Sequence, residues 1–171
     1  MNLYLIGYRG SGKTTVAAEL ARLLGWKWLD ADEEIERRAG KTIQEIFASS
    51  GEPSFRDLEA AVVADLAKLG SQVIALGGGA VLREENRVAI RASGKVVWLQ
   101  ASPGVLFERI SNDASTAERR PNLTAGGGLA EVERLLAIRA PIYAACADLT
   151  LDAEGSLTAE LASRIAIWLK S

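Results

Sequence analysis

The chain of 171 residues contains no histidine and a single cysteine, Cys146. Without histidine, neither a Ser-His-Asp triad nor a Cys-His pair can be assembled, and a zinc site of the usual histidine and cysteine type cannot form within one chain. One cysteine also excludes a disulfide within the chain, and with it a small secreted fold held together by such bridges. The remaining polar groups are carboxylates, amines, guanidinium groups, hydroxyls and backbone amides, which suit phosphate and magnesium chemistry.

An excess of positive charge is missing too, since 20 basic and 22 acidic side chains leave a net charge of −2. Proteins that bind nucleic acid usually carry a basic excess, so we expect no nucleic-acid partner. No run of about eighteen apolar residues is present, and we expect no membrane span. The short apolar run Leu3–Ile6 leads directly into a glycine-rich loop, which is unlike a secretory signal. We therefore expect a cytoplasmic protein.

Length and composition predict one globular domain over residues 1–171, because 49% hydrophobic and 25% charged residues are near the average for soluble proteins. Short apolar runs alternate with segments of helical periodicity. The predicted strands are Leu3–Ile6, Trp26–Leu29, Gln72–Leu76, Lys95–Leu99 and Asp148–Leu151. The predicted helices are Lys13–Leu24, Glu33–Ala39, Thr42–Ser49, Phe55–Leu69, Arg83–Ala92, Pro103–Ile110, Leu129–Ala140 and Leu157–Leu169.

This alternation favours a parallel sheet whose two faces are covered by the connecting helices. The expected fold class is α/β, a three-layer α/β/α sandwich with a five-stranded parallel sheet. Ligands of such sheets bind at the carboxyl ends of the strands. We therefore expect the polar residues and glycines that directly follow predicted strands to meet at one edge of the sheet: Gly7, Asp30, Asp32 and Gly77–Gly79.

Residues Gly7–Thr14 match the phosphate-loop pattern Gly-x-x-x-x-Gly-Lys-Ser/Thr in full, between a predicted strand and a predicted helix. Glycines let backbone N–H groups turn inward around an anion, and the helix N-terminus adds a positive dipole. Lys13 can reach the β- and γ-phosphates, and the Thr14 hydroxyl can ligate magnesium. The alternative is a chance glycine-rich turn. No Asn/Thr-Lys-x-Asp element typical of guanine-binding proteins is present, which favours ATP.

Two carboxylates, Asp30 and Asp32, follow the second predicted strand. On an extended segment, side chains at i and i+2 point the same way. One carboxylate could then hold magnesium-bound water while the other faces the acceptor hydroxyl. The alternative is structural, because aspartate is a favoured N-cap and turn residue: Asp32 would cap the next helix and Asp30 would sit in a turn. The nearby phosphate loop favours the functional interpretation.

Three arginines and a triple glycine complete the candidate site. Arginine grips carboxylates in a two-pronged fashion, but spacing alone does not distinguish Arg56, Arg120 or Arg139 from exposed surface side chains. Gly77-Gly78-Gly79 follows a predicted buried strand. Three residues without side chains allow another group to approach the backbone closely, although a flexible turn would show the same composition.

Taken together, four segments resemble the shikimate kinase family, and the match covers most of the chain. They are the phosphate loop Gly7–Thr15, the stretch Leu29-Asp30-Ala31-Asp32 with Ile35-Glu36 and Gly40, the stretch Gly51–Glu59 that reads Gly-Glu-x-x-Phe-Arg-x-x-Glu, and the triple-glycine strand end Val73–Val81. Unrelated phosphate-loop proteins lack the last two. The resemblance implies a P-loop NTPase fold of the nucleoside monophosphate kinase type. It also implies a transferase that uses ATP to phosphorylate the 3-hydroxyl of shikimate, on the pathway to chorismate and the aromatic amino acids.

The resemblance also implies residue roles. Catalysis would fall to Lys13, Asp32 and Arg120. Nucleotide would contact Gly10, Ser11, Gly12, Lys13, Thr14, Thr15, Arg109 and Arg120. Shikimate would contact Asp32, Arg56, Gly77, Gly78, Gly79 and Arg139. Magnesium, the expected cofactor, would be held by Thr14 and Asp30. Residues at about 32–60 would form the substrate-binding segment and residues at about 111–128 a mobile lid, in a monomer whose partners are the small molecules ATP and shikimate.

The chain departs from the family pattern in places. Ala144-Ala145-Cys146-Ala147-Asp148 replaces a stretch that usually contains glutamate, and Asn122-Leu123 replaces two leucines. Arg119 adjoins Arg120, so either could reach the phosphate. Two alternative functions are a kinase of another small metabolite, such as gluconate or a nucleoside monophosphate, and an ATP-binding module without catalysis. The triple glycine and the Phe-Arg-x-x-Glu stretch argue against the first, and the intact lysine, aspartates and arginines argue against the second.

Overall fold

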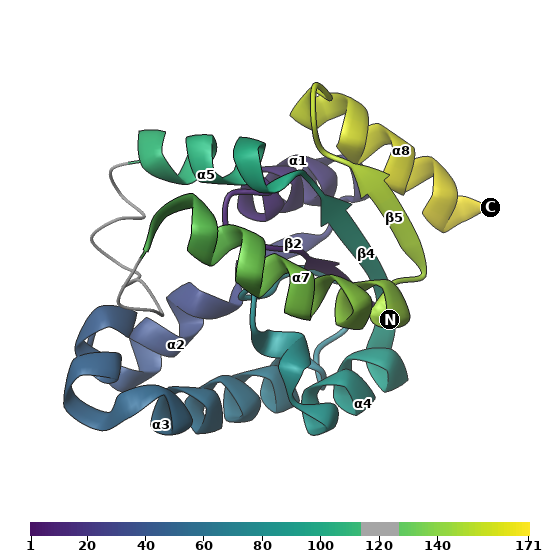
Figure 1. Ribbon diagram of the computed structural model, residues 1–171. Coiled ribbons are helices and arrows are strands. Elements are labelled where there is room, and N and C mark those ends of the chain that lie inside the picture. The colour runs from purple at the N-terminus through teal and green to yellow at the C-terminus, as the bar shows by residue number, and fades with distance from the viewer. Residues whose placement is uncertain (114–126) are drawn as a thin grey trace.

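The structure, a computed structural model, describes residues 1–113 and 127–171. Its sheet has five parallel strands in the order β2-β3-β1-β4-β5. Figure 1 labels β2, β4 and β5 of this sheet and the helices around it. The strands are β1 (Asn2–Ile6), β2 (Lys27–Asp30), β3 (Gln72–Ala75), β4 (Gly94–Gln100) and β5 (Leu149–Asp152). The predicted five-stranded parallel sheet is therefore confirmed, and each strand differs from its predicted bounds by one residue at one or both ends.

Helices cover both faces of this sheet, as the expected three layers require. They are α1 (Lys13–Leu24), α2 (Ala31–Ala39), α3 (Ile43–Leu66), α4 (Glu84–Ser93), α5 (Pro103–Asn112), α7 (Gly128–Cys146) and α8 (Thr158–Lys170), with a short 3₁₀ turn at Ala80–Leu82. Side chains of β1 alternate between the two faces: Leu3 and Leu5 join the cluster that includes α1 and α8, whereas Tyr4 and Ile6 join the cluster that includes α3, α4 and α7.

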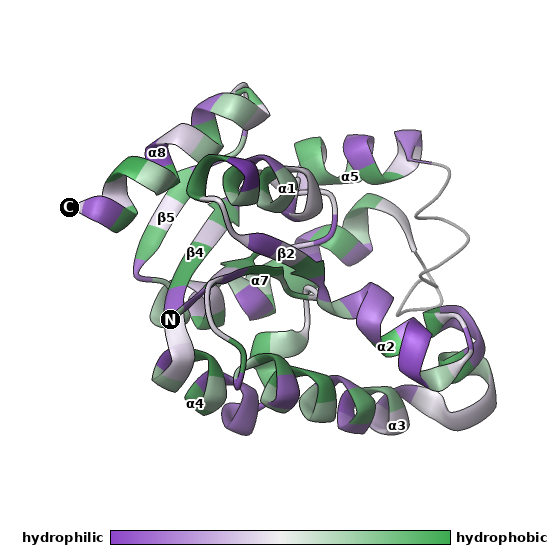
Figure 2. Cartoon of the chain, turned by 180° about the vertical axis from the view of Figure 1, so that it is seen from behind, coloured by the Kyte–Doolittle hydropathy of each residue, from purple (hydrophilic) through white to green (hydrophobic). Residues whose placement is uncertain are grey.

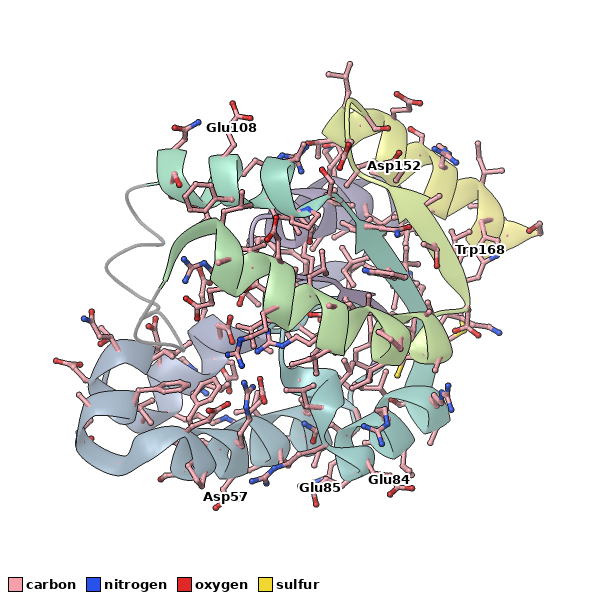
Figure 3. All side chains as sticks on the ribbon, viewed as in Figure 1. Asp57, Glu84, Glu85, Glu108, Asp152 and Trp168 are labelled. Carbon is pink, nitrogen blue, oxygen red and sulfur yellow. The ribbon has the colours of Figure 1, made fainter. Side chains whose placement is uncertain are left out.

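Apolar residues gather on the strands and on the helix sides that face them, while the outer side of α2 is strongly hydrophilic (Figure 2). Figure 3 shows Asp57, Glu84 and Glu85 pointing away from the sheet at the outer side of α3 and α4. There Arg83 pairs with Asp57 at 2.7 Å and with Glu85 at 3.2 Å. Over residues 1–113 and 127–171, the helices lack the combination of length and apolar character needed to span a bilayer.

Local sequence explains where several helices begin and end. α1 starts after Gly12, at φ 90°, and ends at Gly25, at φ 67°, so its bounds agree with the prediction. Both φ values lie in the left-handed region that glycine adopts most easily. α3 begins with a capping box, in which Thr42 and Glu45 satisfy each other's backbone N–H groups.

The predicted helices Thr42–Ser49 and Phe55–Leu69 both fall within α3, whose backbone is non-helical at Gly51 (φ 80°, ψ 171°), so two helical segments meet at a kink between the predicted helices. The second segment ends at Leu66 rather than at Leu69. The predicted end of α7 at Ala140 is wrong, because the helix continues through Pro141 to Cys146. Proline removes one helical hydrogen bond, but Tyr143 and Cys146 beyond it are buried in the core. Their packing outweighs the local cost of the proline.

Candidate active site

The phosphate loop joins β1 to α1 in a backbone conformation that requires glycine. Gly7, Gly10 and Gly12 have φ angles of 143°, 86° and 90°. A Cβ atom on Gly7 would lie 2.5 Å from the carbonyl oxygen of Leu99, which belongs to the neighbouring strand β4. The loop is therefore held both by its own conformation and by close packing against the sheet. Loops with such positive φ angles can turn backbone N–H groups inward around an anion.

Lys13 and Thr14 stand at the start of α1, beside the helix N-terminus. The Lys13 side chain is almost fully buried, and its Nζ donates to the carbonyl oxygens of Gly7 and Tyr8 at 2.8 and 3.0 Å. The Thr14 hydroxyl donates to Oδ2 of Asp30 at 2.7 Å. A cavity opens here, and most of the nucleotide-binding residues expected from the sequence line it: Gly10, Gly12, Lys13, Thr14, Thr15 and Arg109.

Two other expected nucleotide residues stand differently. Ser11 is buried and does not line this cavity. Arg120 lies outside the residues that the structure describes, as do Arg119 and residues 114–126 of the expected lid. Arg109, on α5, donates from Nη2 to the carbonyl oxygen of Ala153 at 2.8 Å, which fixes its guanidinium at the cavity wall.

The acidic pair is arranged differently from the sequence prediction. Asp30, not Asp32, is the N-cap of α2: its Oδ1 accepts from the backbone N–H groups of Asp32 and Glu33 at 2.9 and 3.4 Å. Asp32 lies in the first turn of that helix, so the prediction that both carboxylates lie on one extended segment is wrong. Both line the nucleotide cavity, and Asp32 also lines a second one. The alternative in which Asp32 caps the helix is therefore wrong, because Asp30 is the cap; one Asp30 oxygen caps α2 and the other accepts from the Thr14 hydroxyl.

Thr14 and Asp30 offer the kind of donors that magnesium prefers. Their hydroxyl and carboxylate oxygens are hard ligands, and the 2.7 Å contact places them side by side at the cavity. Across the described residues, no group of three or more acidic, cysteine or histidine side chains could hold a metal ion alone. Magnesium in phosphate-transfer sites is typically held by one or two protein oxygens together with substrate phosphates and water. The residues present fit that pattern.

A second cavity adjoins the first and is lined by every residue expected to bind the acceptor: Asp32, Arg56, Gly77, Gly78, Gly79 and Arg139. Arg56, on α3, donates from Nη1 to Oε2 of Glu59 at 2.7 Å. Arg139, on α7, is buried, and its guanidinium lies over the ring of Tyr8 with 5.5 Å between Cζ and the ring centre. Two guanidinium groups from different helices thus face one cavity, a geometry suited to a carboxylate.

The triple glycine lies against these side chains. A Cβ atom on Gly77 would lie 2.7 Å from Oδ1 of Asp32, and one on Gly79 would lie 2.6 Å from Cζ of Arg56. On Gly78 it would lie 3.4 Å from Nη1 of Arg139. The Tyr143 hydroxyl also donates to the carbonyl oxygen of Gly78. Gly77 and Gly79 therefore admit a charged side chain closer to the backbone than a Cβ atom would allow, which is the close-approach interpretation of the sequence, whereas a Cβ atom on Gly78 would make only an ordinary contact.

Sequence reasoning missed some residues of this cavity. Glu59 is 1% exposed, and its Oε1 has no hydrogen-bond partner in the described part of the chain. Burial raises the pKa of Glu59, and the Arg56 guanidinium acts in the opposite direction. The i, i+3 spacing of these two residues on a helix could have revealed the pair. Nothing in the sequence marked the remaining lining of the cavity. Its apolar wall comprises Ile43, Phe47, Phe55, Phe107, Ile110 and Val132, and the acidic Glu131 lies beside it.

Known shikimate kinases are similar to this chain over most of its length. The family model described as shikimate kinase matches residues 9–170. A shikimate kinase from Rhodopirellula baltica is 49% identical over 151 residues, which are 88% of this chain and 81% of the relative. One from Moorella thermoacetica is 44% identical over 170 residues, which are 99% and 95% of the two chains.

Among solved structures, shikimate kinase from Acinetobacter baumannii in complex with shikimate superimposes with a TM-score of 0.92 at 37% identity. The alignment covers 99% of this chain and 92% of that one. A second, from Bacteroides thetaiotaomicron, gives a TM-score of 0.85 at 33% identity and covers 100% and 99%. The match of one family model to nearly the whole chain, with several relatives above 40% identity, establishes that this chain belongs to the shikimate kinase family.

Proposed function

We propose that this chain is a shikimate kinase that transfers the γ-phosphoryl group of ATP to the 3-hydroxyl of shikimate, giving shikimate 3-phosphate and ADP. The observation that carries the proposal is that the phosphate-loop cavity and the cavity with two arginines meet at Asp32, which lines both. A phosphoryl donor and a carboxylate-bearing acceptor can therefore be held next to each other, and positioning is most of what phosphoryl transfer demands of a protein.

The acceptor is held by its carboxylate. Arg56 and Arg139 supply guanidinium groups from α3 and α7, and Glu59 keeps the first of them directed into the cavity. The glycines of the triple-glycine segment let both guanidinium groups lie close to the strand end. The Acinetobacter baumannii relative was solved with shikimate bound, which supports the same acceptor here. The charge and geometry select a small acid that carries a hydroxyl on the side toward the phosphate loop.

The nucleotide phosphates lie in the loop, where backbone N–H groups, the α1 dipole and Lys13 neutralise their charge. Thr14 and Asp30 would hold magnesium, which when bound shields the phosphate charge. Arg109 contacts the nucleotide farther from the reacting phosphate. Arg120 remains, by family resemblance, the arginine expected on the transferring phosphoryl group, with Arg119 as its neighbour and alternative.

Asp32 orients the acceptor hydroxyl and takes its proton. The hydroxyl oxygen forms a bond to the γ-phosphorus, the bond from that phosphorus to the bridging oxygen of ADP breaks, and the proton passes to the Asp32 carboxylate. Asp32 is 6% exposed and lies where the cavities meet, so little water competes for that position. Replacement of Asp32 by asparagine keeps the shape and removes the acceptor for the proton, and we expect kcat to fall by about 100-fold or more.

The organisation of the chain follows from these roles. Residues at about 32–60 contribute the acceptor-binding segment, and residues at about 111–128 form the lid that excludes water during transfer. The working unit that we propose is a monomer. We place the enzyme in the cytoplasm, where ATP and magnesium are available.

Measurement of ADP formation tests the function. With ATP and magnesium, turnover is expected to require shikimate and to be absent with gluconate or a nucleoside monophosphate. Turnover with gluconate instead would assign the chain to another acceptor. Binding of ATP without turnover on any acceptor would make it a binding module. Identification of shikimate 3-phosphate by NMR would fix the hydroxyl that is modified.

A further inference from the structure

Arg9 occupies a position of the phosphate loop that the pattern leaves open. In Gly7-Tyr8-Arg9-Gly10 it is one of the four variable residues, and phosphate binding by such loops relies on backbone groups and the lysine. The reaction as derived above gives this side chain no task. Its position in the fold is nevertheless distinctive, because it stands at the boundary between the two cavities.

Among the residues that the structure describes, four line both cavities: Arg9, Asp32, Ile43 and Ile110. Two of them are aliphatic, so Arg9 and Asp32 are the charged pair at the junction. Asp32 carries the proton-accepting role, which leaves Arg9 as the cation beside the space between donor and acceptor. The guanidinium is partly buried, and a group at such a site interacts more strongly with nearby charge than it would in water.

The backbone of Arg9 lies close to Gly78 of the triple glycine. A Cβ atom on Gly78 would lie 3.6 Å from the backbone nitrogen of Arg9 and 3.4 Å from Nη1 of Arg139. The phosphate loop therefore packs against the strand end that carries the acceptor site. A side chain that starts from this point is anchored to both sites at once, which is what a group acting between two substrates requires.

Two carboxylates lie near the Arg9 guanidinium. Burial lowers the pKa of Arg9, while the Tyr8 hydroxyl, Glu131 in the first turn of α7 and Asp113 at the end of α5 act to raise it. Arginine stays protonated in proteins under such opposing influences. These acidic groups lie on the elements that enclose the cavities, so they also limit the directions in which the long side chain can turn.

From this geometry we infer that Arg9 is a further catalytic residue, a cation that contacts the phosphoryl group as it passes from ATP to the acceptor. The inference rests on the proposed function. Its guanidinium binds the oxygens of the transferred group, where negative charge is spread during transfer. The same contact persists in the product, where the phosphate remains on the acceptor. Arg9 should therefore distinguish the phosphorylated acceptor from the free one.

Binding of the two acceptor forms tests this. Calorimetry compares shikimate and shikimate 3-phosphate on the wild type and on Arg9→Met, which keeps side-chain length without charge. We expect Arg9→Met to weaken binding of shikimate 3-phosphate by about 10- to 100-fold, because a charged hydrogen bond is lost. Binding of shikimate should weaken by less than about twofold, since shikimate carries no phosphate for Arg9 to contact. We expect kcat of Arg9→Met to fall by a similar factor. Arg9→Lys should recover part of the affinity for shikimate 3-phosphate and part of kcat. Arg22→Met, an exposed change on α1, should alter neither that affinity nor kcat.

Equal weakening of both ligands, or of neither, would overturn the inference and leave Arg9 a structural residue of the loop. Circular dichroism checks that the variant folds, and if Arg9→Met does not, the same comparison is made with Arg9→Gln. A wild-type protein that does not turn over shikimate would refute the proposed function and this role together. Normal wild-type turnover with an unchanged Arg9→Met would refute this role alone.

Discussion

Arg56 and Glu59 form a hydrogen-bonded ion pair of 2.7 Å, one turn apart on α3, at the wall of the acceptor cavity. The Glu59 side chain is 2% exposed, whereas Glu52, which also approaches Arg56 at 3.3 Å, is 50% exposed. A buried partner directs the guanidinium more firmly than a solvated one, because water does not compete for it. The buried pair therefore decides where Arg56 points.

Removal of the Glu59 carboxylate should weaken binding of the acceptor and leave binding of the nucleotide nearly unchanged. We expect Glu59→Ala to raise KM for shikimate by about 10-fold or more, because it leaves Arg56 without its buried anion. KM for ATP should change less than twofold. Steady-state kinetics with each substrate varied measures both. Glu52→Ala is the matched control, since its exposed pair should contribute little, and an equal effect from the two variants would contradict the prediction.

The triple glycine gives a steric test. Gly79→Ala puts a methyl group 2.6 Å from Cζ of Arg56, and the backbone at φ −102° accepts alanine without strain. The guanidinium must move, so we expect at least a 10-fold loss in shikimate affinity with little change in ATP affinity. Gly70→Ala is the control, because no described atom lies within 4 Å of its Cβ position. Unchanged shikimate affinity in Gly79→Ala would show that the close approach is dispensable.

Asp30 combines a cap with a proposed metal ligand, and two substitutions separate these roles. Asp30→Asn keeps a good N-cap but loses the charge near Thr14, so the magnesium concentration for half-maximal turnover should rise about 10-fold at nearly constant stability. Asp30→Ala should also lose about 1 kcal/mol of unfolding free energy. Titration of magnesium and urea denaturation give the two quantities. Identical magnesium dependence in the wild type and Asp30→Asn would exclude the ligand role.

Metal removal should separate binding of the acceptor from turnover. With a chelator present, turnover is expected to stop, because phosphate charge is no longer shielded. Shikimate should still bind with an affinity within about twofold of its ordinary value, since its cavity uses arginines and no metal. Calorimetry with and without chelator measures this. Loss of shikimate binding on chelation would place the metal in the acceptor site instead.

A pH test falls on α2, away from the chemistry. Hydrogen bonds from Arg37 and Arg38 lower the pKa of Glu34 from 4.5 to about 2. Because the folded pKa is depressed, the stabilisation is complete above the ordinary value and is lost as pH falls through about 2. Since the pair is largely solvent-screened, Glu34→Gln should lose about 0.5–1 kcal/mol at pH 7 and less at pH 3. Urea denaturation at the two pH values measures this, and a constant difference would contradict the assignment.

Periodic patterns predicted the elements of this fold well where their ends are marked by local chemistry. α1 matches its predicted bounds because glycines stand at both ends. The prediction failed at Pro141, where a local rule expected the end of α7. Burial of Tyr143 against the core depends on residues distant in sequence, and no local pattern reports it. By contrast, the kink in α3 at Gly51 falls between the two helices predicted there, because glycine readily adopts the positive φ that interrupts the helix.

The composition and motifs by themselves determined the chemistry. A chain without histidine but with a complete phosphate loop, a triple glycine and a Phe-Arg-x-x-Glu stretch is equipped for phosphoryl transfer by lysine, arginine and carboxylate. Only the tertiary structure decided how these groups meet. It made Asp30 rather than Asp32 the cap, set Asp32 and Arg9 where two cavities join, and buried Glu59 beside Arg56. These side chains come together because strand ends and helix faces from distant parts of the chain converge. The energies of their interactions depend on burial, which spacing along the chain does not specify.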